Sequence, residues 1–295
     1  MKRKKLSLMI CVSAVMLLLT GCTGSDLNSA VFVSSAGIAY DGKEYAVSVC
    51  GSAADRDGEK SITASGKGRT VEEALEDIRR SSGYEPFFGH CGAAAADANA
   101  LRDGTAFEFL ADSRISPACR IYYSDDPLKA AENIADEGFT EEMYRAAVCL
   151  DNNAAMVLPL AEEPYRTVSV TEDSVYRNDM CESIGLMMLR GADFSREFTV
   201  KTESGYVTAE ISPKVKRSAE YIDGALVMKA DIRLNAKDCG SCAEAELISA
   251  AETLCRDAFE KCVVEENIDS VGLYKLIGYK KPELNTARLE LKVAV

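Results

Sequence analysis

The hydrophobic and polar positions of the first 22 residues form three blocks. Residues 2–5 are all basic, residues 6–19 are apolar except for two serines, and the pattern ends in Leu19-Thr20-Gly21-Cys22. A basic start, a short apolar run and small residues at the end are typical of a secretion signal, here of the bacterial lipoprotein kind because a cysteine follows. A transmembrane helix is the competing interpretation, but the run is shorter than the about 20 residues that such a helix needs. The pattern therefore predicts a signal peptide over residues 1–21.

Cys22 is the predicted lipidation site. We expect signal peptidase to recognise Leu19, Thr20 and Gly21 and to cleave before Cys22, whose thiol then carries a diacylglyceryl group. At about 0.8 kcal/mol for each buried methylene, two acyl chains of the palmitate kind hold a domain durably on the outer leaflet. Residues 22–30 are mostly small and polar and form the predicted tether between lipid and domain.

Residues 31–160 are predicted to form an N-terminal domain of mixed strands and helices. Two apolar-rich segments flank Asp41-Gly42, which is a strong hairpin signal. Thr70 with Glu73 three residues later is a capping box, and apolar positions spaced by three and four follow it, so a helix is expected to begin there. The expected strands are 31–39, 44–50, 61–65 and 121–123, and the expected helices are 71 to about 81, 101–110, 126–135 and 141–150.

The pattern changes after a polar boundary at residues 151–164, and residues 165–295 are predicted to form a C-terminal domain. Its first part is strand-rich, with turns at Ser204-Gly205 and Asp223-Gly224. Residues 242–266 carry an apolar stripe opposite acidic residues, which is typical of a long helix with one buried face. Residues 287–295 alternate apolar and charged, as in a half-buried strand. The other expected elements are strands at 167–170, 174–177, 197–202, 206–211, 219–222 and 225–234, and a helix at 182–189.

These elements predict an α+β protein with two domains of mixed content. The C-terminal domain is expected to be a largely antiparallel sheet packed by the long helix. Alanines dominate residues 91–100, and alanine has a low strand preference, so this segment is expected to be a weakened strand or a helix.

The excess of acidic residues indicates which kinds of partner the chain can bind. The chain has 34 Lys and Arg against 47 Asp and Glu, and cleavage at Cys22 would remove four of the basic residues. An acidic surface disfavours nucleic acid as a partner and gains nothing from anionic lipid headgroups. Membrane attachment is therefore expected to come from the acyl chains or from a protein partner.

The cysteine pattern favours buried thiols over a disulfide framework. The chain has 11 cysteines, of which Cys11 is lost with the signal and Cys22 is used by the lipid. The remaining number is odd and the spacing is irregular, unlike the frameworks of small secreted domains. We therefore expect most of these residues to be small buried apolar side chains. A disulfide set is the alternative.

Three motifs could carry chemistry, and each has a structural interpretation that we favour. Gly66-Lys67-Gly68-Arg69-Thr70 lacks the spacing of a phosphate loop, so flexible backbone at a strand-to-helix turn explains the glycines. His90 is the single histidine and no Gly-x-Ser-x-Gly elbow accompanies it, so we expect it to donate a structural hydrogen bond from a turn. Cys239-Gly240-Ser241-Cys242 has redox or zinc spacing, but no βαβ pattern precedes it.

Zinc at that motif would need two more ligands. Cys255 and Cys262 are the next candidates, and they lie seven residues apart on one face of a helix, about two turns from each other. That separation does not close a small tetrahedral site. We predict no catalytic residues, no metal site and no cofactor.

Taken together, these features resemble the C subunit of spore nutrient germinant receptors, the Ger(x)C or GerAC-type lipoproteins. The resemblance rests on the lipidation motif, on Gly37-Ile38 with Asp41-Gly42, on Ser65-Gly66-Lys67-Gly68, on Phe88-Gly89-His90 and on Asp269-Ser270-Val271-Gly272. It covers nearly all of the mature chain. This chain departs from the family by its short length, by Thr23 after the lipidated cysteine, by its alanine-rich segment and by its cysteine content.

The resemblance implies a non-enzymatic subunit on the outer face of the spore's inner membrane. Such a subunit assembles with an integral-membrane A subunit and a transporter-like B subunit, and the complex acts in germination by responding to small nutrients. The alternative function is that of a generic extracytoplasmic lipoprotein that binds a small solute between its two domains.

Overall fold

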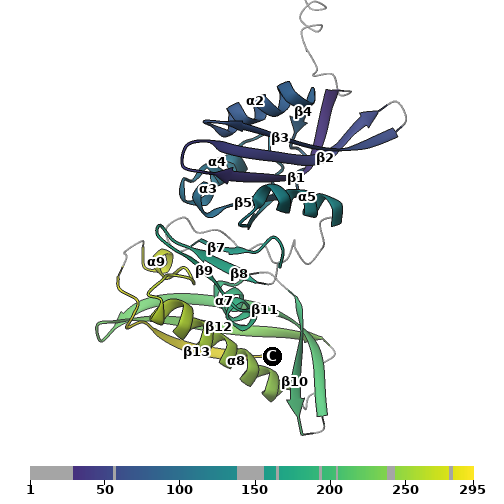
Figure 1. Cartoon of the computed structure of the whole chain (residues 1–295). Coiled ribbons are helices and arrows are strands. Elements are labelled where there is room, and N and C mark those ends of the chain that lie inside the picture. The colour runs from purple at the N-terminus through teal and green to yellow at the C-terminus, as the bar shows by residue number, and fades with distance from the viewer. Residues whose placement is uncertain are drawn as a thin grey trace, which may run out of the picture.

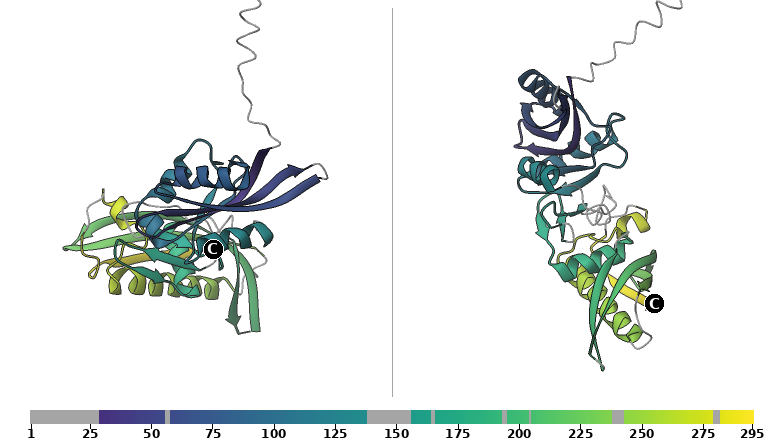
Figure 2. Two further views of the ribbon diagram at one scale, coloured as in Figure 1. Left: turned by 45° about the horizontal axis from the view of Figure 1, so that its top comes forward. Right: turned by 90° about the vertical axis from the view of Figure 1, so that its right-hand side faces the viewer.

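The computed structural model describes residues 29–55, 58–137, 156–163, 166–192, 195–203, 205–237, 243–278 and 282–295. The signal and the lipidation motif, the expected helix 141–150 and the Cys239–Cys242 motif lie outside these ranges. The described chain forms two lobes with a small sheet between them (Figure 1), and a second view shows the lobes at opposite ends of an elongated molecule (Figure 2).

The N-terminal lobe is built on a six-stranded sheet. Its strands are β1 (Ala30–Tyr40), β2 (Tyr45–Asp55), β3 (Gly58–Gly68), β4 (Glu85–Phe87), β5 (Ala93–Ala96) and β6 (Arg120–Tyr123), in the order β3-β2-β1-β5-β6 with β4 beside the start of β1. The predicted hairpin is confirmed: β1 and β2 pair antiparallel across Asp41-Gly42, where Gly42 has φ 91°. β5 pairs parallel with both β1 and β6.

Helices cover both faces of this sheet. α2 (Val71–Ser82) packs on the face that holds Val31 and Val33, and α5 (Pro127–Glu137) packs on the other face, where the Ser35 hydroxyl donates to the Ala131 carbonyl at 2.7 Å. The expected helix 101–110 is instead two helices, α3 (Ala98–Arg102) and α4 (Thr105–Ala111), because Gly104 adopts φ 84° between them.

Of the two hydrogen bonds of the capping box predicted for α2, the structure has one and lacks the other. The Thr70 hydroxyl accepts a hydrogen bond from the Glu73 N–H at 3.1 Å. The Glu73 carboxylate accepts from the Arg69 N–H at 2.8 Å and not from Thr70, so the reciprocal bond of a capping box goes to a neighbouring residue. The helix ends at the expected place, where Gly83 adopts φ 77°.

The alanine-rich segment is a regular strand, contrary to the expectation that it is weakened or helical. All four residues of β5 are fully buried between β1 and β6. A strand covered on both faces is stabilised by its burial and pairing, and this overrides the low strand preference of alanine.

A three-stranded antiparallel sheet joins the two lobes. It contains β7 (Met156–Pro159), β8 (Thr167–Val170) and β9 (Val175–Arg177). Leu158, Val168 and Val170 belong to the same buried cluster as the N-terminal sheet. On the other side, the Thr167 N–H donates to the Ser183 hydroxyl at 2.9 Å. The small sheet therefore contacts both lobes.

The C-terminal lobe is a four-stranded sheet of β10 (Arg196–Thr202), β11 (Gly205–Ile222), β12 (Ala225–Lys237) and β13 (Arg288–Ala294). The first three strands are antiparallel, and β13 joins β12 in parallel. The two strands expected at 206–211 and 219–222 are one continuous strand, β11. Its hairpin with β12 across Asp223-Gly224 is confirmed.

Helices cover one face of this second sheet. They are α7 (Met180–Arg190), α8 (Glu244–Phe259), which continues into the π-helical segment η2 (Glu260–Glu265), and the short α9 (Leu273–Leu276). The long helix expected at 242–266 is thus confirmed in its described part, and its apolar face is buried in the core as predicted. Gly185 lets α7 approach α8 closely, because a Cβ there would lie 2.6 Å from the Ala258 Cβ. The whole is an α+β fold, as predicted.

Candidate functional site

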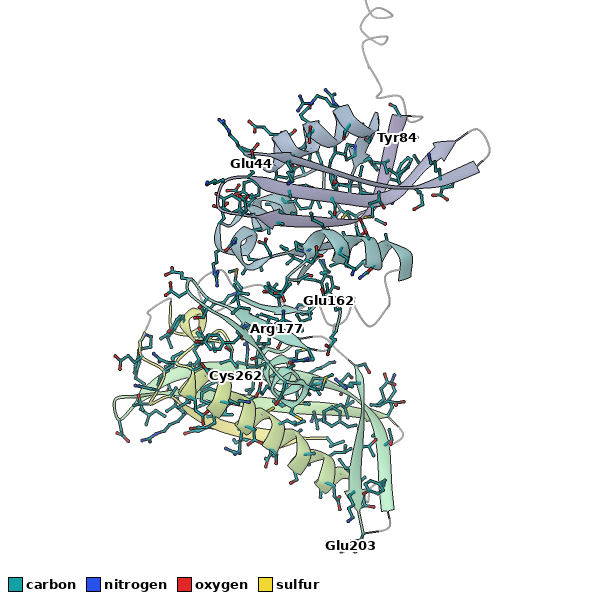
Figure 3. All side chains as sticks on the ribbon, in the orientation of Figure 1. Glu44, Tyr84, Glu162, Arg177, Glu203 and Cys262 are labelled. Atoms are coloured by element: carbon teal, nitrogen blue, oxygen red, sulfur yellow. The ribbon has the colours of Figure 1, made fainter. Side chains whose placement is uncertain are left out.

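The predicted lipidation site lies just before the first described residues. Leu19, Thr20, Gly21 and Cys22 remain predictions, because the structure describes the chain from residue 29. β1 begins at Ala30, beside Glu85 of β4. Tyr84, which immediately precedes β4, lies at the end of the upper lobe that faces away from the lower lobe (Figure 3). The chain therefore enters the fold at the far end of the N-terminal lobe.

Three rings gather at this entry point, and we call Phe32, Phe87 and His90 the aromatic end. The parallel pairing of β1 with β4 sets Phe32 beside Phe87, with ring centroids 5.6 Å apart. The His90 ring lies 6.1 Å from that of Phe32 and 6.0 Å from that of Phe87. His90 is exposed in the turn after β4 and its ring packs on the two phenylalanines, so the hydrogen bond predicted for it is replaced by ring contact.

The glycine-rich motif before α2 has a structural role, but not the one predicted. Gly66 and Gly68 lie within β3 and not in a turn, and their φ angles are not positive. A Cβ on Gly66 would lie 2.8 Å from the Ile78 nitrogen, and one on Gly68 would lie 2.6 Å from the Ala74 nitrogen. The glycines therefore allow the backbone of α2 to lie directly on the strand, which explains them by close approach and not by flexibility.

Five of the six described cysteines are buried, as expected. Cys50, Cys91, Cys119, Cys255 and Cys262 are buried and Cys181 is exposed. Burial raises the pKa of Cys255 and of Cys262 to about 12 in each case. The Cys91 thiol lies 3.6 Å from the Cys119 sulfur, and this contact, together with burial, raises the pKa of Cys91. Cys91, Cys255 and Cys262 therefore keep their protons at physiological pH and act as apolar side chains.

The Asp269–Gly272 motif is a junction of the C-terminal lobe. The Asp269 carboxylate accepts N–H groups of Leu273 at 2.6 Å and Tyr274 at 2.7 Å, which caps α9. Burial raises the pKa of Asp269, although these hydrogen bonds act in the opposite direction. Arg190 donates to the Ser270 carbonyl at 2.9 Å and Arg217 to the Val271 carbonyl at 2.8 Å, so guanidinium groups from α7 and β11 hold the loop.

One pocket of about 350 Å³ lies between α2 and α4 in the N-terminal lobe. Its wall is partly apolar, and the Tyr45 hydroxyl at its edge contacts Asp103 and lies 2.8 Å from the Thr105 hydroxyl. Arg114 crosses its rim to Glu72 at 3.0 Å. Its lining is Tyr45, Arg69–Glu72, Leu75, Phe88, Thr105, Glu108, Phe109, Asp112, Arg114 and Ile115. All of these residues belong to the N-terminal lobe, so this pocket is not a cleft between the lobes.

None of the described helices has both the length and the apolar character to cross a bilayer. Within the same residues, no three His, Cys, Asp or Glu side chains are grouped closely enough to hold a metal ion.

Comparison with known proteins identifies the N-terminal lobe. Residues 24–143 match the family model described as the spore germination protein N-terminal domain. The crystal structure of the GerBC protein matches with 13% identity over 88% of this chain and 96% of that chain, at a TM-score of 0.47. No curated protein matches the sequence.

Residues 24–143 are therefore similar to the N-terminal domain of spore germination proteins. Over these residues, the match agrees with the resemblance to GerAC-type proteins that the motifs predict.

Proposed function

We propose that this chain is a lipid-anchored, non-catalytic subunit of a spore nutrient germinant receptor. It is attached at Cys22 to the outer face of the spore's inner membrane and docks there with the integral-membrane A subunit and the transporter-like B subunit. One observation carries the proposal. The match to the spore germination domain begins at residue 24, two residues after the predicted lipidated cysteine. The anchor and the germination domain are therefore contiguous.

The chemistry of the described residues supports a docking role. The single histidine packs against two phenylalanine rings, and the glycine-rich motif serves the packing of α2 on β3. Cys91, Cys255 and Cys262 have raised pKa values, whereas a nucleophilic cysteine needs a lowered one. A subunit that positions partners needs none of these groups as reagents.

The anchor is tested by Cys22→Ala in the sporulating host, with Cys181→Ala as the matched control at an exposed cysteine. We expect Cys22→Ala to leave the spore membrane fraction and to fail to co-isolate the A and B subunits, because two acyl chains are lost. Cys181→Ala should remain membrane-bound and assembled. Retention of Cys22→Ala in the membrane with both partners would refute the anchor.

Docking is tested by crosslinking in intact spores. We expect the purified adducts of the wild-type chain to contain a polytopic membrane protein and a transporter-like protein. Adducts that contain only a permease with an ATPase would instead support the alternative, in which the lipoprotein captures a small solute. The pocket between α2 and α4 lies within one lobe, so it is not the site between the two domains that this alternative requires.

A further inference from the structure

We propose that the aromatic end (Phe32, Phe87 and His90) rests in the interfacial layer of the bilayer that holds the anchor. The N-terminal lobe would then contact the membrane through protein as well as through lipid, with β4 facing the membrane and the C-terminal lobe pointing away. This inference rests on the proposed function, because it takes Cys22 as the lipidated residue.

The tether restricts how far the aromatic end can lie from the membrane. Ala30, the first residue of β1, follows Cys22 by eight positions. A fully extended chain of that length reaches about 26–29 Å, and a relaxed chain reaches less. Phe32 follows Ala30 by two residues, and the strand register fixes Phe87 beside Phe32. The rings are therefore among the parts of the fold that lie closest to the attachment point along the chain.

The aromatic end also offers the kind of side chain that membrane interfaces favour. Among the described residues, the large apolar side chains that are exposed are Phe87 at 45%, Tyr206 at 76%, Tyr221 at 51% and Val295 at 38%. Tyr206 and Tyr221 belong to β11 of the C-terminal sheet, and Val295 directly follows β13. Phe87 is thus the exposed one at the tethered end, and aromatic rings are enriched at the boundary between lipid and water.

The rings are held in place before any contact with lipid. Phe32 and Phe87 pack edge to face with an interplanar angle of 76°. The Phe87 ring lies over Gly89 so closely that a Cβ at Gly89 would be 2.6 Å from its Cζ atom. A side chain that is fixed in advance loses little conformational freedom on contact.

The charges beside the aromatic end are already paired. Arg79 at the end of α2 lies 3.1 Å from Glu76 and 3.6 Å from Glu85, and Arg80 lies 3.6 Å from Asp77. This differs from the unpaired Lys and Arg clusters that recognise anionic headgroups. The expected contact is therefore with the apolar boundary of the bilayer and depends little on anionic lipid.

The absence of tryptophan from the chain allows a direct test. Phe87→Trp places a single fluorescent reporter at the aromatic end, and Tyr206→Trp places a matched one on an exposed aromatic position of the C-terminal sheet. Each lipidated full-length variant is reconstituted into phosphatidylcholine vesicles with brominated acyl chains. We expect a blue-shifted emission and at least twofold quenching for Phe87→Trp, and neither change for Tyr206→Trp. Replacing a third of the lipid with phosphatidylglycerol should leave the quenching unchanged.

Vesicle flotation in the same samples separates this inference from the anchor. Protein that floats while Phe87→Trp remains unquenched would overturn the membrane contact and leave the anchor intact, and it would point to a protein partner at the aromatic end. Protein that does not float would overturn both. If Phe87→Trp fails to fold, Glu85→Trp replaces it, since Glu85 is an exposed residue two positions earlier on the same face of β4.

Discussion

The two principal sheets of this protein differ in how many of their faces are covered by helices. The N-terminal sheet has helices on both faces, and its strands carry glycines and alanines where those helices lie closest. The C-terminal sheet has helices on one face, and its outer face presents residues such as Lys214, Asp231 and Lys292 to solvent. A sheet covered twice tolerates added volume on neither face, whereas a sheet covered once tolerates it on the outer face. Position in the layer thus decides the cost of a substitution.

The largest expected effect is at Gly66 of β3. Gly66→Val should lower the free energy of unfolding by about 3 kcal/mol, because the added side chain meets the backbone of α2, which cannot move aside cheaply. Urea unfolding followed by circular dichroism measures the change. Lys214→Val on the outer face of β11 is the matched control and should change stability by less than about 0.5 kcal/mol. Equal losses at the two positions would break the comparison between the sheets.

A smaller loss is expected at the junction loop of the C-terminal lobe. Asp269→Ala leaves the N–H groups of Leu273 and Tyr274 without their acceptor, and this should cost about 2 kcal/mol. Asp269→Asn keeps one acceptor oxygen and should recover part of the loss. Thermal unfolding of the three proteins gives the ranking, and an alanine variant as stable as the asparagine variant would show that the cap contributes nothing.

The buried thiols predict a loss of stability at alkaline pH. An unfolded thiol loses its proton near pH 9, whereas Cys255 keeps its proton to about pH 12 in the folded protein. The contribution of this thiol to the free energy of unfolding is complete below pH 9. It declines as the pH rises toward 12, because the folded state then binds more protons than the unfolded state. Between pH 8 and pH 10 the decline should be about 1.4 kcal/mol for this group.

Two variants separate this effect from the cost of a cavity. Cys255→Ala should lose its share of the pH dependence between pH 8 and pH 10 in urea unfolding. Leu247→Ala, a truncation of another buried residue on α8, should be destabilised equally at both pH values. An unchanged pH dependence in Cys255→Ala would show that this thiol titrates normally.

Much of this fold follows from local sequence patterns, and the exceptions have physical causes. The Asp41-Gly42 hairpin, the stop of α2 at Gly83 and the buried face of α8 each depend on neighbouring residues, so local reasoning finds them. The β5 strand and the parallel pairing of β13 depend on partners distant in sequence, and the role of Gly66 depends on how closely α2 packs on β3. Composition reveals neither.

The candidate site also has one part that depends on local sequence and one part that depends on distant partners. The lipidation motif is local and was predicted, but the structure describes none of its residues. The ring contacts of Phe32 with Phe87 and His90 needed the parallel register of β1 and β4, and β4 has only three residues. A strand as short as β4 shows no alternation of apolar and polar residues that would indicate its pairing with β1. The aromatic end therefore could not be predicted. The Phe87–His90 segment was noticed as a motif, but nothing in the sequence indicates that Phe32 packs against it.

The smallest effect distinguishes the helix starts of the two lobes. α2 has Thr70 as its N-cap with the reciprocal bond diverted to Arg69, whereas α7 has a complete capping box between Asp179 and Glu182. Thr70→Ala should cost about 1 kcal/mol, the usual value for one lost cap, and Thr70→Ser should restore most of it. Asp179→Ala should cost somewhat more, because the Glu182 side chain, which accepts from the Asp179 N–H, also pairs with Lys261 and relies on that geometry. Urea unfolding of the three variants and the wild-type chain measures the order. A Thr70→Ala loss equal to that of Asp179→Ala would mean that the second bond of the box adds nothing, and that the exposed start of α2 is as firmly fixed as the half-buried start of α7.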